Sequence, residues 1–132
     1  MSRASRLWAR TGAALALTWP LLACGGSGAA TCLGWVEDDQ GAQHSPEEGT
    51  ADRERAQRLA CNGYCRDADP GYDAMYQVWR DSPAGDPSVT KAEAIFRDEA
   101  LMRYVTETCA DRCLSEIASG ARRGGVDCED GR

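Results

Sequence analysis

Seven cysteines are the residues of this sequence with the most distinctive chemistry, and four of them form two Cys-x-x-x-Cys motifs, "CNGYC" and "CADRC". In a helix, residues four apart lie one turn apart on the same face, so each motif presents two sulfurs to one partner. Two such helices running antiparallel would oppose the sulfurs in the pairs Cys61–Cys113 and Cys65–Cys109. The spacing therefore predicts two disulfides that cross-link a pair of helices.

The same four thiols could instead bind a metal, because four thiolates suit a tetrahedral zinc site or a copper(I) site. The Cys-x-x-Cys and histidine spacings typical of zinc modules are missing, however. A thioredoxin-like redox enzyme would also need Cys-x-x-Cys beside a βαβ unit. We therefore expect disulfides with no resident metal or cofactor, and a metal-handling protein is the alternative.

The other three cysteines have different surroundings. Cys32 and Cys128 flank the two motifs, and they are left to pair in a third disulfide that ties the start of the fold to its C-terminal tail. Cys24 is the odd one, because it is followed by "GGSGAAT", a segment without side chains that could form a core. Such a composition is typical of a flexible tether.

The residues before Cys24 have the layout of a secretory signal peptide. Residues 1–10 contain three arginines and no acid, and residues 11–23 form an apolar run that ends in a small residue. The run of 13 residues is shorter than the roughly 20 that a membrane-spanning helix needs. The sequence therefore predicts export with removal of residues 1–23.

The end of this run, Leu21-Leu22-Ala23-Cys24, resembles the lipobox of bacterial lipoproteins. The resemblance implies cleavage after Ala23 by signal peptidase II and acyl chains on Cys24, which would attach the protein to a membrane. Gly25 stands where an aspartate would imply the inner membrane, so the enteric sorting rule implies the outer membrane. The alternative is an ordinary secreted protein in which Cys24 joins a disulfide.

Charge and composition narrow the classes of partner. The chain has 21 acidic and 15 basic residues, and removal of residues 1–23 takes away three of the arginines, so the net charge falls from −6 to −9. A surface this acidic argues against nucleic acid as a partner. The chain also has only one phenylalanine, and so thin a core is typical of small domains that depend on disulfides.

Three Xaa-Pro pairs predict the starts of helices, because proline suits the first helical position and keeps the preceding residue extended. These pairs are Ser45-Pro46, Asp69-Pro70 and Asp86-Pro87, and they predict helices at about 46–67, 70–80 and 88–119. Strand signals are not apparent. The fold class predicted is all-α, a disulfide-pinned helical hairpin with a short extra helix in its connection.

The two motifs resemble the twin Cys-x-x-x-Cys helical hairpins of small mitochondrial intermembrane-space chaperones and plant hairpinin peptides. The resemblance concerns geometry only and implies the same cross-linked pair of helices. Here 43 residues separate the motifs, more than is usual in those families, and this segment contains the second predicted helix.

Three further features are candidates for function. Tyr72, Tyr76 and Trp79 share one face of the second predicted helix, where they would form an aromatic surface for a partner or pack against the hairpin. His44 is the single histidine and lies in a polar loop, which predicts a solvated side chain. Asp69, within "DADPGYD", is interpreted as a helix cap, because that segment lacks the glycine and glutamate of a calcium loop.

Together these observations predict a domain organisation and a class of function. We expect a signal peptide at 1–23, a lipidated cysteine with a tether and a short docked segment at 24–44, and a helical domain at 45–132. The predicted function is a lipid-anchored envelope protein that binds an unknown envelope partner or has a structural role and is not an enzyme. The alternative is a periplasmic zinc- or copper-handling protein.

Overall fold

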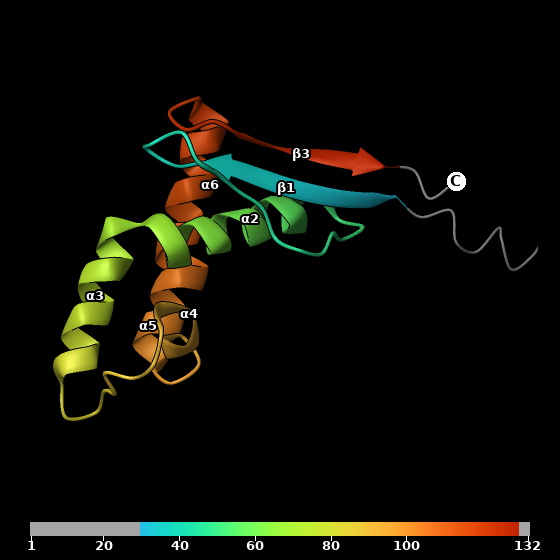
Figure 1. The fold of residues 1–132 in the computed structure, drawn as a ribbon. Helices are drawn as coiled ribbons and strands as arrows, with labels where there is room; N and C mark the ends of the chain where they lie inside the picture. The colour runs from blue at the N-terminus through green and yellow to red at the C-terminus, as the bar shows by residue number, and fades with distance from the viewer. Residues whose placement is uncertain (1–29, 130–132) are drawn as a thin grey trace, which may run out of the picture. The chain divides into compact units, whose positions relative to one another are not determined.

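Residues 30–129, which the computed structural model describes, form a three-stranded antiparallel sheet packed against helices (Figure 1). The strands are β1 (Thr31–Glu37), β2 (Gln43–His44) and β3 (Gly124–Glu129), in the spatial order β2-β1-β3. The predicted all-α fold is therefore wrong. Within 24–44, the part expected to dock on the helices supplies β1 and β2, and the predicted tether at 25–31 overlaps β1 only at Thr31.

The buried face of β1 explains why the strand has no clear signal in the sequence. Cys32, Gly34 and Val36 are buried in alternation, so two of the three inward positions are not typical strand formers. A side chain at Gly34 would collide with the helix below, since an added Cβ would lie 2.2 Å from the Ala56 carbonyl oxygen. The glycine thus allows the helix backbone to lie directly against the strand.

That helix, α2 (Arg53–Ala68), begins later than predicted. Asp52 is its N-cap, and the Asp52 carboxylate accepts a hydrogen bond from the amide of Glu54 at 2.9 Å. The predicted start at Ser45-Pro46 is wrong because the intervening chain is extended along the sheet. Thr50 exchanges two backbone hydrogen bonds with Cys32, which holds this segment beside β1.

The second predicted helix is confirmed as α3 (Pro70–Asp81). Asp69 is its N-cap and Pro70 occupies the first turn, as the Asp-Pro pair indicates. The Asp69 carboxylate accepts a hydrogen bond from the amide of Tyr72 at 3.0 Å.

The third predicted helix is broken at its start. Asp86 forms a turn with Ser88, and helical structure begins only after Thr90. A second interruption precedes Asp98, which caps the next helix by accepting from the amide of Leu101 at 3.1 Å. The elements of this part are α4 (Lys91–Ala94), α5 (Glu99–Arg103), the π-helix η1 (Tyr104–Cys109) and α6 (Ala110–Ser119).

The π-helix keeps a row of apolar residues on one face. Residues four apart in an α-helix turn through about 400°, so such a row drifts by about 40° per step. The wider π turn advances fewer degrees per residue and offsets this drift. Leu101, Val105, Cys109 and Cys113 accordingly all remain buried.

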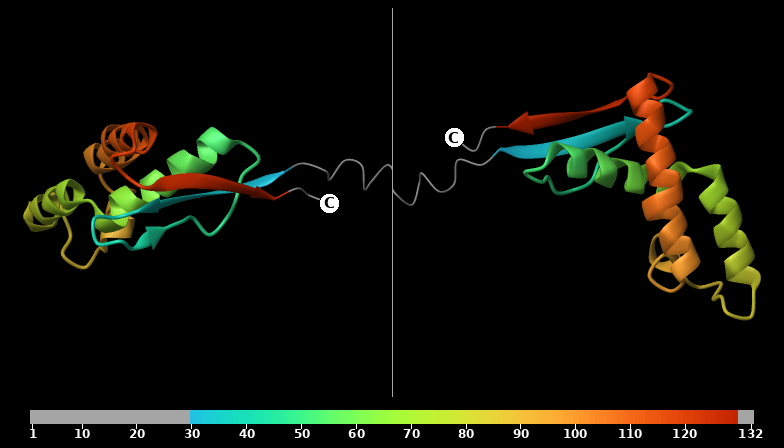
Figure 2. Two further views of the ribbon diagram at one scale, coloured as in Figure 1. Left: turned by 90° about the horizontal axis from the view of Figure 1, so that it is seen from above. Right: turned by 180° about the vertical axis from the view of Figure 1, so that it is seen from behind.

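The helices lie on one side of the sheet and extend beyond it (Figures 1 and 2). α2 runs beneath β1, and α6 crosses α2 steeply instead of lying alongside it as a hairpin would. α3 and α5 project away from the sheet, and side chains of α2, α3, α5, η1 and α6 meet in one core. The predicted antiparallel hairpin is therefore replaced by two crossing helices.

None of the helices within residues 30–129 has the length and apolar character that crossing a bilayer requires. The predicted signal peptide, the lipobox and Cys24 lie outside the described residues.

Candidate functional site

The six cysteines of the described residues form three disulfides, which confirms the predicted pairing. The bonds join Cys61 to Cys113, Cys65 to Cys109 and Cys32 to Cys128. The two bonds between α2 and the η1–α6 segment, called the helix rungs below, have all four sulfur-bearing residues fully buried. Within residues 30–129 no cluster of potential ligands could hold a metal. Three disulfides indicate an oxidising, extracytoplasmic compartment.

The Cys32–Cys128 bond, called the strand clasp below, has a different environment. It joins β1 to β3, and the Cα atoms of its two cysteines are 3.9 Å apart. The Glu37 amide donates a hydrogen bond to the Arg123 carbonyl in the same antiparallel register of these two strands. Cys32 is buried, but Cys128 is exposed. The guanidinium of Arg53 donates to the Cys128 sulfur at 3.1 Å, so a positive charge lies against this bond.

The aromatic residues of α3 do not form a surface. Tyr72, Tyr76 and Trp79 are 0%, 7% and 8% exposed, so the predicted partner surface is wrong and these side chains belong to the core. The Tyr72 hydroxyl donates to the Lys91 carbonyl at 2.6 Å, and burial raises the pKa of Tyr72 to about 12. Hydrogen-bonded hydroxyls allow tyrosine rings to be buried at this depth.

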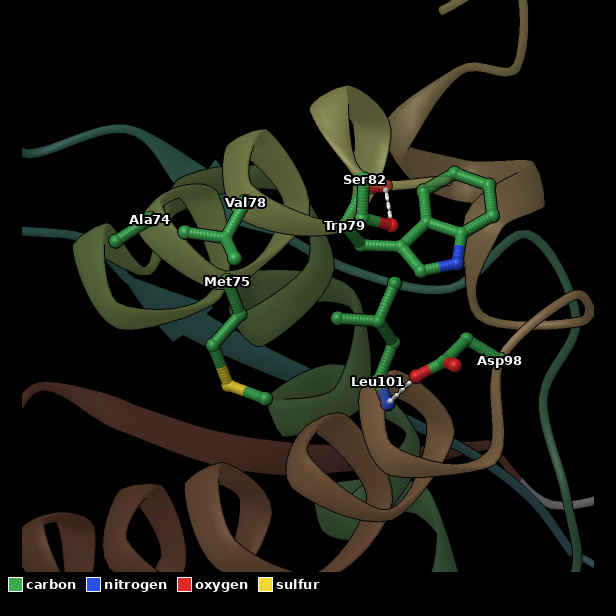
Figure 3. A pocket seen from close by; sticks show the side chains of 7 residues that line it. All are labelled: Ala74, Met75, Val78, Trp79, Ser82, Asp98 and Leu101. Atoms are coloured by element: carbon green, nitrogen blue, oxygen red, sulfur yellow. Dashed lines mark hydrogen bonds between the residues drawn. The ribbon is translucent and has the colours of Figure 1, made fainter. Parts of the chain in front are cut away.

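An apolar groove lies instead between α3 and the start of α5 (Figure 3). Its volume is about 400 Å³, and its lining residues are Ala74, Met75, Val78, Trp79, Ser82, Asp98 and Leu101. Val78 is 74% exposed, which is high for a large apolar side chain. The only charged residue in the lining, Asp98, already caps α5.

Asp69 is the buried acid of the domain, and its partners explain its burial. Besides the amide of Tyr72, it accepts hydrogen bonds from the Tyr104 hydroxyl and the Arg112 guanidinium, both at 2.6 Å. Burial, and then this hydrogen bond to Asp69, raise the pKa of Tyr104. Both carboxylate oxygens of Asp69 therefore have partners, and these bonds connect the start of α3 to η1 and α6, which is a structural role. The predicted cap function of Asp69 is confirmed.

His44 is not the solvated residue that its loop position predicts. Its side chain is only 19% exposed, and its Nε2 lies 2.9 Å from an oxygen of Asp38. This hydrogen bond is the main cause of the lowered pKa of Asp38. The imidazole packs edge-on against Tyr64, and the guanidinium of Arg122 lies 4.3 Å from the centre of that ring.

His44 also lines a second cavity, called the polar pocket below, between α2 and the segment that follows β2. Its volume is about 350 Å³, and its lining residues are Gln43, His44, Ser45, Pro46, Leu59, Asn62, Gly63, Arg66 and Asp67. The α2 residues 59, 62, 63 and 66 follow the spacing of one helix face. This face is separate from the one that carries the helix rungs.

Protein-family models, curated proteins and solved structures contain no match to this chain.

The two cavities differ in the chemistry they offer. The apolar groove provides contact area without a free polar group, whereas the polar pocket combines carboxamides, a hydroxyl, an imidazole and a charged pair. Ligand pockets typically combine apolar walls with a few such polar groups that fix orientation. The polar pocket has a single signal in the sequence, Gly63, a glycine inside a predicted helix, and was not predicted from it.

Proposed function

We propose that the protein is an exported lipoprotein, anchored through Cys24 to the outer membrane, whose disulfide-bonded domain acts as a non-enzymatic binding module. The observation that carries the proposal is the set of three disulfides, since such bonds form and persist outside the cytoplasm. The lipobox resemblance and the signal-peptide layout of residues 1–23 support the same compartment.

The start of the fold supports presentation close to a membrane. β1 begins at Thr31, seven residues after Cys24, and seven extended residues span at most about 25 Å. An acylated Cys24 would therefore hold the sheet end of the domain near the lipid surface. A partner or ligand in the same envelope compartment would be within reach.

The side chains of residues 30–129 favour binding over catalysis. All six cysteines of this region are in disulfides, so in the oxidised protein none of them can act as a nucleophile or as the metal ligand that the alternative function needs. His44 is hydrogen-bonded to Asp38, but residues 30–129 offer no free thiol that this pair could activate as a cysteine nucleophile. The two cavities offer recognition surfaces instead.

The test compares wild type with Cys24→Ser and Gly25→Asp in a Gram-negative host. We expect wild type to partition into detergent with the mass of residues 24–132 plus acyl chains, and to fractionate with the outer membrane. Cys24→Ser should lose the lipid mass, because the acyl acceptor is gone. Gly25→Asp should keep the lipid but move to the inner membrane.

Ser27→Ala, in the same segment, is the matched control and should behave as wild type. A mature wild-type protein without lipid mass would contradict the proposed anchor, whatever the fate of the variants.

A further inference from the structure

We propose that the polar pocket binds a small, neutral ligand through a secondary amide that carries a methyl group. The pocket is formed by one face of α2 and by the chain from Gln43 to Pro46. Its volume of about 350 Å³ lies within the usual range of small-molecule sites. The inference deepens the proposed function, because it rests on the domain being a binding module.

Gly63 is the first observation that points to a ligand. It lies in the interior of α2 without a positive φ, and a Cβ added there would meet no atom within 4 Å. Glycine destabilises a helix interior relative to alanine, and here neither backbone conformation nor packing requires it. Gly34 shows the contrast, since the helix backbone leaves no room for a side chain there. A glycine in a pocket wall lets a ligand approach the helix backbone.

The charges around the pocket favour a neutral ligand. Arg66 donates two hydrogen bonds to Asp67, at 2.8 and 3.0 Å, and His44 is paired with Asp38. The pairing with Arg66 is the main cause of the lowered pKa of Asp67. A charged ligand would have to compete with one of these pairs, whereas a neutral ligand leaves both intact.

The uncharged lining residues indicate which neutral group fits. Gln43 and Asn62 contribute carboxamides, which pair with an amide as both donor and acceptor. The Asn62 Oδ1 is buried and has no hydrogen-bond partner within residues 30–129. This oxygen can therefore accept a hydrogen bond from a ligand without breaking a bond inside the protein. Leu59 and Pro46 supply apolar surface for a methyl group. An N-acetyl or N-acyl amide combines these features.

The experiment titrates the oxidised full chain, purified in detergent, and follows backbone and carboxamide NMR shifts of Asn62 and Gly63. N-acetylglucosamine and N-acetylalanine methylamide are the two probes, and they distinguish a sugar source from a peptide source of the same amide. Glucose and glucosamine, which lack the acetyl group, are the controls for the sugar probe. Alaninamide, which has neither the acetyl group nor a secondary amide, is the control for the peptide probe. We expect at least one amide probe to shift these signals and to bind at least tenfold more tightly than its control.

Variants at Gly63 separate binding from folding. Gly63→Leu should fill the pocket and weaken binding at least tenfold, whereas Arg55→Leu, on an exposed part of the same helix, should not. Gly63→Ala should raise the melting temperature by about 2–8 °C while it weakens binding. This opposite movement keeps the test informative if the leucine variant does not fold.

Three results would overturn the inference: neither amide probe shifts the pocket signals, the controls bind equally well, or Gly63→Ala leaves the affinity unchanged. The presence or absence of lipid on Cys24 does not enter this titration, so its outcome is separate from the test of the anchor.

Discussion

The helix rungs and the strand clasp cross-link the same small domain in opposite surroundings. The rungs join the α2 helix to the η1–α6 segment through cysteines that are fully buried. The clasp joins two strands near the end of the sheet, with Cys128 exposed and Arg53 against its sulfur. All three bonds constrain the unfolded chain, but only the rungs also form part of the core.

Loop length alone would rank the clasp first. Its cysteines are 96 residues apart, compared with 52 and 44 for the rungs. The loop-entropy model gives about 4–5 kcal/mol for each bond taken alone. With a neighbouring rung intact, however, the second rung closes a ring of only about 10 residues and contributes roughly 3 kcal/mol. The two rungs together therefore constrain the unfolded chain by about 7 kcal/mol, more than the clasp does, and their burial adds packing of the sulfurs to this.

Removal of both rungs has the largest expected effect. Replacing Cys61, Cys65, Cys109 and Cys113 by alanine should cost about 7 kcal/mol of chain constraint, and the lost sulfur packing adds to this. Such a loss is comparable with the whole stability of a small domain, about 5–15 kcal/mol. We expect urea unfolding followed by circular dichroism to lose its cooperative transition.

The matched control is Cys32→Ala with Cys128→Ala, which should still unfold cooperatively with its helices retained. If the clasp variant instead loses cooperativity and the rung variant keeps it, the roles assigned to the two regions are reversed.

The same comparison shows which features were predictable from sequence. The pairing of the helix cysteines was predictable because i, i+4 spacing places two sulfurs on one face of each helix, and an antiparallel sense of the two helices selects Cys61–Cys113 and Cys65–Cys109. This pairing holds even though α2 and α6 cross instead of lying side by side. The sheet was not, because the inward face of β1 contains Cys32 and Gly34, and β3 begins with two glycines. Strand signals depend on β-branched and aromatic residues, which these positions lack.

The candidate sites follow the same division. The spacing of Tyr72, Tyr76 and Trp79 correctly predicts one shared helix face, but spacing does not tell whether that face is buried. The carbonyls that accept from the tyrosine hydroxyls come from Val89 and Lys91, in a segment expected to be helical. The polar pocket depends on where the chain after β2 lies, so only Gly63 hints at it in the sequence.

Selective reduction gives the next largest effect. We expect low concentrations of dithiothreitol to reduce the clasp about a hundredfold faster than the rungs. Attack on a buried sulfur requires local opening, and an opening that costs about 3 kcal/mol slows the reaction by about that factor. Trapping with iodoacetamide and peptide mapping would find Cys32 and Cys128 labelled first. Early labelling of Cys65 or Cys109 would show that the crossing of α2 and η1 opens more readily than the sheet end.

Substitution of Arg53 is expected to have the smallest effect on the difference in reduction rate between the clasp and the rungs. Its guanidinium attracts an incoming thiolate and stabilises the negative charge that develops on the sulfurs, so Arg53→Gln should slow reduction of the clasp by a few-fold, less than about tenfold. The effect is small because the contact is exposed and screened by salt, and it should shrink further in about 1 M salt. Arg55→Gln is the matched control, and rung reduction should not change in either variant. Equal rates in wild type and Arg53→Gln at low salt would mean that exposure of Cys128 alone makes the clasp labile.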